Sequence, residues 1–293
     1  MIKQLINQSQ KRVIVVRCHR SGNTLLQSIL LTNPSIISFP ESHFFVYLFK
    51  RRTDFQKRFN LASRYARPGF ANFIRESGYQ NFQPGLPRYA VTLGQQTEVF
   101  TSTLDKIAQN QQKSIWIEKT PDHVNFINFI EAYVRDALFI HIVRNGPDAI
   151  ASLYDVTQKY PHAWEGPWKV ERCLNKWITC AQNTCQHVQK PNHLMIRYEM
   201  LVDDLASASQ ELSNFIGAEL HTNVSTDRRD EFKNIALERE PWKENSAKPI
   251  YQKSRSKFSS LFDAEQQQYI LDAIANAGLT DIKANFGNMA AKA

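Results

Sequence analysis

The sequence predicts an α/β fold in which helices flank a central parallel sheet. Short, continuously apolar runs alternate along the chain with longer segments of helical periodicity. Strands that are buried on both faces have this continuous apolar character, which is typical of parallel sheets. Polar loops directly follow several of the runs. Because ligands of open parallel sheets bind beyond the carboxyl ends of the strands, these loops are the expected site.

Five runs have the composition of buried strands, since they are rich in apolar and β-branched residues and end at turn residues or polar loops. They cover residues 12–17, 36–39, 115–119, 137–143 and 193–197. The fourth run, ALFIHIV, is the most apolar of the five, which predicts a central strand.

Helical patterns fill the intervals between the strands. Thr120 and Pro121 are typical of an N-cap and a first helical position, and they predict a helix that continues to residue 133. Pro147 opens the helix after the fourth strand. The other expected helices cover residues 24–31, 91–109 and about 167–189. The last third of the chain is mostly helical in pattern, apart from a Lys-, Arg- and Ser-rich segment at 248–257.

The length of 293 residues predicts a single domain with a helical and loop insertion at about 43–110. The 36 Lys and Arg residues outnumber the 28 Asp and Glu residues, and the net charge of +8 suits an anionic ligand. No basic stripe with interleaved aromatic residues accompanies this charge, so nucleic acid is not an expected partner.

The chain contains no apolar run of the roughly 18 residues that a membrane span needs, and its first residues are too polar for a secretory signal. We therefore expect a cytoplasmic protein that does not associate with a membrane. The four cysteines have no CxxC spacing, and no His, Cys and Asp cluster has the spacing of metal ligands. Free thiols and the absence of a metal site are the expectation.

The first loop has the residues of an anion site. Arg20, Ser21, Gly22, Asn23 and Thr24 lie between a strand and a helix. The glycine allows close backbone approach, the helix start offers free N–H groups, and the side chains add donors and a forked cation. The loop lacks the Lys and the GxxxxGK[ST] pattern of a Walker A loop. By itself the loop is equally consistent with a tight, capped turn.

A second anion site is predicted after the fourth strand. Arg144 lies at the strand end, and Ser152 follows eight residues later in the next helix. An arginine that only ends a strand and an ordinary helical serine are the alternative. Two anion sites at one sheet edge suit a ligand with phosphates at both ends, such as a bisphosphorylated nucleotide.

With these loops in place, the sequence resembles the sulfotransferases that use 3′-phosphoadenosine 5′-phosphosulfate (PAPS). Five segments carry the resemblance, and they occur in the family's order between about residues 15 and 205: RSGNTLL, FPESHFF, IEKTPDH, RNGPDAIASLY and RYEMLVDDL. The match is to the soluble bacterial-type branch, whose Pro-Glu and Lys-Thr-Pro segments also occur in protein-tyrosine sulfotransferases. The resemblance implies a P-loop-NTPase-like sulfotransferase fold and no metal cofactor.

The resemblance also implies roles for individual residues. Glu41 is the expected catalytic base, and Lys119 with Arg20 is expected to stabilise the charge on the leaving phosphate. Residues 20–24 are expected to bind the 5′-phosphosulfate, and Arg144 with Ser152 the 3′-phosphate.

Three further residues are expected to bind the nucleotide. Tyr198 is the expected neighbour of the adenine, with a half-buried packing residue as the alternative. Arg255 and Lys257 loosely match the late contacts to the 3′-phosphate, with a solvated basic loop as the alternative.

His43 and His123 are rival bases and the expected contacts to the acceptor, whose pocket we place near residues 43–110 and 155–170. The expected acceptor is a small, specialised metabolite with a hydroxyl or amine group; a carbohydrate or a lipid is the alternative. A P-loop kinase and a basic nucleic-acid-binding protein are more remote alternatives. The sequence does not indicate an oligomeric state.

Overall fold

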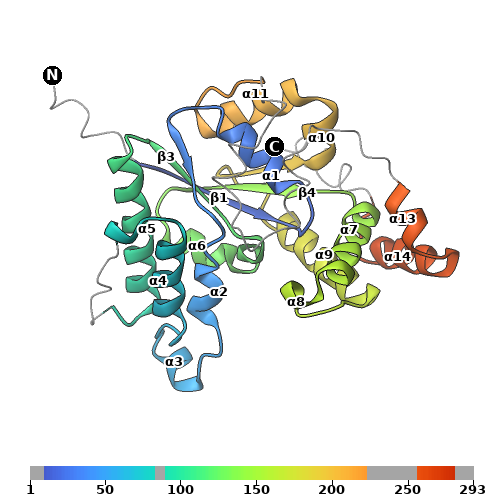
Figure 1. Ribbon diagram of the computed structural model, residues 1–293, viewed down its shortest axis with the longest axis horizontal. Helices are drawn as coiled ribbons and strands as arrows, with labels where there is room; N and C mark the ends of the chain where they lie inside the picture. Colours follow the sequence, from blue (N-terminus) through green and yellow to red (C-terminus); the bar gives the residue numbers. More distant parts are fainter. Residues whose placement is uncertain (1–9, 83–89, 223–255, 281–293) are drawn as a thin grey trace.

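The computed structural model describes residues 10–82, 90–222 and 256–280 (Figure 1). Its centre is a parallel five-stranded sheet with the order β2-β3-β1-β4-β5. The strands are β1 (Lys11–Arg17), β2 (Ile36–Ser38), β3 (Ile115–Lys119), β4 (Ala137–Val143) and β5 (His193–Arg197). All five predicted strands are confirmed, and the most apolar one, β4, lies inside the sheet between β1 and β5.

Helices cover both faces of the sheet (Figure 1). Alternate residues of β1 point to opposite faces: Val13 and Val15 belong to one core cluster, and Ile14 and Val16 to the other. The first cluster is completed by α1 (Asn23–Leu30), α10 (Tyr198–Asp203) and α11 (Leu205–Ile216). The second is completed by α2 (Phe44–Phe49), α4 (Ala66–Glu76), α5 (Leu93–Asn110), α6 (Ile127–Tyr133), α7 (Gly146–Lys159), α9 (Val170–Cys185) and α14 (Ala264–Asn276). The predicted α/β class with a flanked parallel sheet is therefore confirmed.

The predicted helix after Thr120 is divided in two. A 3₁₀ segment, η2 (Pro121–Phe126), precedes α6. The remaining short elements are α3 (Asp54–Arg58), η1 (Gln80–Phe82), α8 (Pro161–Trp164) and α13 (Ser256–Leu261). Within the described residues, no helix is both long enough and apolar enough to cross a membrane. A cytoplasmic location stays a prediction.

An aromatic cluster anchors the segment that follows β2. Phe44 of α2 stacks on Phe100 of α5, with ring centroids 4.1 Å apart, and Phe45 packs against the same ring. Both α2 residues are fully buried. Since α2 begins directly after residues 40–43, this packing fixes the loop that carries Glu41 above the carboxyl end of β3.

Candidate active site

The loop between β1 and α1 has the backbone of an anion site. Arg20 and Gly22 both have left-handed φ angles, of 66° and 84°. A Cβ at position 22 would lie 2.1 Å from the Tyr198 ring, so glycine is required by both conformation and space. The Ser21 side chain is buried, and its hydroxyl has no hydrogen-bond partner among the residues that the structure describes. An unpaired buried donor at this point fits an anionic ligand.

The two predicted anion sites meet. The Arg20 Nε donates to the Ser152 Oγ of α7 at 3.2 Å. Burial, together with the positive charges of Arg17 and Arg144, lowers the pKa of Arg20 to about 10. The guanidinium still carries its charge at neutral pH. Arg17 and Arg144 thus lie close enough to repel Arg20, and a bound anion would relieve that repulsion.

Tyr198 joins the two loops. Its ring lies against Gly22 on one side, and the Arg144 guanidinium lies 4.7 Å from the ring centroid. Arg144 also lies 3.7 Å from Asp148, at the start of α7. The predicted neighbour of the adenine is therefore placed between the predicted 5′ and 3′ phosphate sites.

The late basic segment is described only in part. Arg255 and the side chains of Asn23 and Thr24 lie outside the described residues. The Lys257 Nζ lies 2.5 Å from the Asp155 Oδ2, on α7, three residues after Ser152. Lys257 is half exposed, and its partner Asp155 lies close enough to Arg20 for their charges to interact.

Positive charges surround the predicted base. The Glu41 Oε1 lies 3.0 Å from the Arg17 Nη2 and 3.9 Å from the Lys119 Nζ, and its Oε2 lies 3.7 Å from the His43 Nε2. Lys119 is almost completely buried at the end of β3. The structure thus brings Glu41, Lys119 and His43 together. Arg17 is not among the predicted site residues, although its position at a strand end beside the first loop is a usable signal.

Glu118, one residue before Lys119, belongs to a buried polar cluster. It accepts hydrogen bonds from the Ser42 and Thr120 hydroxyls at 2.6 and 2.7 Å, and the His123 Nδ1 lies 2.8 Å away. Burial alone would raise the pKa of Glu118, but attraction to His123 and these hydrogen bonds together lower it. The cluster ties the loop after β2 to the end of β3.

His123 therefore has a different place from the one expected. It is fully buried, its Nδ1 faces Glu118, and its ring packs edge-on against Phe45 at 4.8 Å. Its Nε2 accepts a long hydrogen bond of 3.4 Å from the Phe45 backbone. This placement does not fit a contact with an acceptor; it fits a residue that supports the loop.

A cavity of about 660 Å³ opens beside Arg17 and His19. Its walls come from η2, residues 167–169 and α9 rather than from residues 43–110. The Arg172 guanidinium stacks on Trp168 at 3.9 Å and forms part of the wall. Since Arg17 also bonds Glu41, the cavity adjoins the predicted base.

Comparison with known proteins decides the family. The model described as "Sulfotransferase family" matches residues 12–222, which is most of the chain. The chain belongs to the sulfotransferase family. Among curated proteins, no sequence matches this sulfotransferase.

Solved structures agree with the fold. The sulfotransferase domain from the Synechococcus PCC 7002 olefin synthase is 18% identical, covers 92% of this chain and 96% of its own, and has a TM-score of 0.56. The sulfotransferase domain from the curacin biosynthetic pathway is 17% identical and has a TM-score of 0.58; the match covers 91% of this chain and 98% of that domain. Mouse sulfotransferase SULT7A1, solved with PAP, is 13% identical and has a TM-score of 0.52; the match covers 91% of this chain and 84% of the mouse chain. The predicted sulfotransferase fold is confirmed.

Proposed function

We propose that this sulfotransferase moves the sulfuryl group of PAPS to a hydroxyl or amine of a small-molecule acceptor. The observation that carries the proposal is the meeting of the two anion loops, seen in the Arg20–Ser152 hydrogen bond and in the Tyr198 ring between Gly22 and Arg144. A donor with phosphates at both ends matches this arrangement. The mouse sulfotransferase that shares the fold was solved with PAP, the product that PAPS leaves.

The residues divide between the two ends of the donor. The backbone of residues 20–24 and the unpaired Ser21 hydroxyl would hold the 5′ end. Arg144 and Ser152, with Lys257 beside them, would hold the 3′-phosphate. Tyr198 would lie between the two ends, next to the adenine.

The transfer is an in-line displacement at sulfur. Glu41 takes the proton of the acceptor, whose oxygen or nitrogen forms the new bond to sulfur. The bond between sulfur and the bridging oxygen breaks, and its electron pair stays on the phosphate of PAP. Lys119 and Arg20 stabilise that charge, while Arg17 holds the carboxylate of Glu41 in place at 3.0 Å.

The acceptor enters the cavity beside Arg17. A small, specialised metabolite is the proposed class, which suits the size of about 660 Å³. Two of the similar structures come from an olefin synthase and the curacin biosynthetic pathway, which supports a biosynthetic role. The exposed Arg172 and Lys169 on the wall favour an acceptor that also carries a carboxylate or phosphate.

Calorimetric titration with PAP tests the donor site. We expect one PAP to bind per chain. Arg144→Ala should lower the affinity for PAP about 10- to 100-fold, since charged hydrogen bonds contribute roughly 1.5–3 kcal/mol. Arg20→Ala should also weaken binding, whereas Arg58→Ala on the exposed surface of α3 should not. If pure, folded protein binds no PAP, the assignment of PAPS as the sulfuryl donor is wrong.

Transfer of labelled sulfate to a panel of acceptors then tests the reaction. Magnesium-dependent ATP hydrolysis without sulfate transfer would favour the kinase alternative, and a salt-dependent gel shift would favour nucleic-acid binding.

A further inference from the structure

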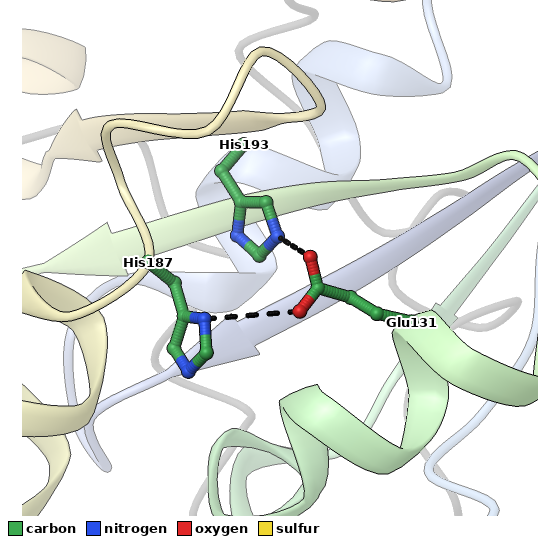
Figure 2. A group of neighbouring side chains, drawn as sticks. All are labelled: Glu131, His187 and His193. Carbon is green, nitrogen blue, oxygen red and sulfur yellow. Dashed lines mark hydrogen bonds and ion pairs between the residues drawn. The ribbon is translucent and has the colours of Figure 1, made fainter.

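Three potential metal ligands meet away from the active site. They are Glu131 of α6, His187 just after α9 and His193, the first residue of β5 (Figure 2). One donor atom from each lies within 4.8 Å of the other two. The Glu131 Oε1 is 3.0 Å from the His193 Nε2, and its Oε2 is 3.8 Å from the His187 Nδ1.

The His187 ring contains an unpaired atom that faces this group. The residue is only 7% exposed, and its Nδ1 is buried with no hydrogen-bond partner among the residues that the structure describes. The Nδ1 points toward Glu131 at a distance too long for a hydrogen bond (Figure 2). A buried ring nitrogen in this state loses the interactions it has in water, and a metal ion would restore one.

A hydrogen-bond chain supports the second histidine. The His193 Nδ1 lies 2.8 Å from the His141 Nε2, and the His141 Nδ1 lies 3.2 Å from the Thr184 hydroxyl. His193 also stacks on Phe139, with centroids 4.4 Å apart, so its ring is held in one orientation. Metal-binding histidines characteristically have such a partner on their second nitrogen.

The protons of this hydrogen-bond chain can be arranged so that the His193 Nε2 is free to bind a metal. Without one, the His193 Nε2–H donates to Glu131, and its Nδ1 accepts from His141, whose Nδ1 accepts from Thr184. With a metal on Nε2, the His193 proton lies on Nδ1 and donates to His141, whose Nδ1–H then donates to Thr184. Each ring keeps one proton, the hydrogen bonds between His193, His141 and Thr184 are kept with their direction reversed, and the metal replaces the hydrogen bond from His193 to Glu131.

We propose that Glu131, His187 and His193 bind one zinc ion. Two imidazoles and a carboxylate are a known ligand set for zinc, and a water would complete the tetrahedron. Zinc–ligand bonds of about 2.0–2.1 Å place tetrahedral ligands roughly 3.4 Å apart. The donor atoms lie within 4.8 Å of one another, so any two of them need to approach by at most about 1.4 Å. Glu131 is partly exposed, which gives the ion a path from solvent.

Lys190 competes with the metal. Its Nζ lies 2.6 Å from the Glu131 Oε2, and its side chain is 40% exposed. In the zinc-bound state the ammonium either stays on Oε2, with the metal on Oε1, or moves into solvent. Its charge opposes that of zinc in both cases, so removal of the charge should tighten zinc binding.

The site lies at the end of β5 opposite the proposed active site. Tyr198 lies five positions after His193, which corresponds to roughly 16 Å along an extended strand. Zinc here would connect α6, the end of α9 and β5, and would stabilise the fold rather than take part in sulfuryl transfer.

Calorimetry with zinc sulfate on untagged, chelator-treated, full-length protein tests the site. We expect one zinc per chain and a raised Tm, and an absorption spectrum of tetrahedral cobalt when Co²⁺ replaces zinc. His187→Ala and Glu131→Gln should each weaken zinc binding at least tenfold. His162→Ala, which changes an exposed histidine of α8, should leave it unchanged.

Lys190→Gln keeps the test decisive if a ligand variant is unstable. This variant should bind zinc several-fold more tightly than the wild type. The proposal is overturned if the wild type binds no stoichiometric zinc at micromolar concentrations, or if the Lys190 and His187 variants bind zinc as the wild type does. PAP binding is measured on the same samples, so a failure here is distinguishable from a failure of the proposed function.

Discussion

Two carboxylates near the end of β3 have opposite surroundings. Glu41 bonds Arg17, which lines the cavity, and its other basic neighbours are Lys119 and His43. Glu118 is fully buried and is held by two hydroxyls and His123 at 2.6–2.8 Å. The difference lies in the partners rather than in the residue type: basic side chains beside the cavity surround Glu41, whereas hydroxyls in the core hold Glu118 and tie the loop after β2 to β3.

The largest effect is expected from Glu41→Gln, which removes the proposed base and keeps the shape of the side chain. We expect kcat to fall roughly 10²–10⁴-fold while PAP affinity stays near that of the wild type. Glu98→Gln, on the exposed surface of α5, is the matched control and should leave both unchanged. Full turnover in the Glu41 variant would show that another group, with His43 the nearest candidate, takes the proton.

Glu118→Gln should act on stability instead. The change removes the negative charge that accepts hydrogen bonds from the Ser42 and Thr120 hydroxyls in the core, so the free energy of unfolding should fall by about 1.5–3 kcal/mol. Urea denaturation of the purified variant measures this loss. A stability equal to that of the wild type would contradict the supporting role that we assign to the buried cluster.

The same variant has an expected pH signature. The pKa of Glu118 is lower in the folded chain than its ordinary value of 4.5. The stability that it contributes is therefore complete above pH 4.5 and is lost as the pH falls below that value through the folded pKa. As the pH falls over this interval, the free energy of unfolding should decrease more steeply for the wild type than for Glu118→Gln. An equal decrease in both proteins would contradict a lowered pKa of Glu118.

The smallest effect is expected from a substitution in the wall of the cavity beside Arg17. Arg172 is exposed and stacks on Trp168, so Arg172→Ala should raise the KM for an anionic acceptor about tenfold or less. PAP affinity and kcat should change little. An unchanged KM for every charged acceptor in the panel would show that Arg172 does not contact the acceptor.

The sequence by itself determined the five strands and the loops that follow them. Continuous apolar runs indicate buried strands locally, and parallel strands place all their carboxyl ends at one edge. Arg20, Glu41, Lys119 and Arg144 could therefore be predicted to converge. The motif resemblance then supplied the family, which the match over residues 12–222 confirmed.

Only the tertiary structure decided which side chains touch across elements. The contact of Arg17 with Glu41, the Tyr198 ring against Gly22 and the burial of His123 depend on strand order and helix packing. The grouping of Glu131 with His187 and His193 depends on strand order and helix packing as well, since Glu131 and His193 are 62 positions apart in the sequence. Local periodicity indicates which face of an element is buried; it does not specify which distant residue that face will meet.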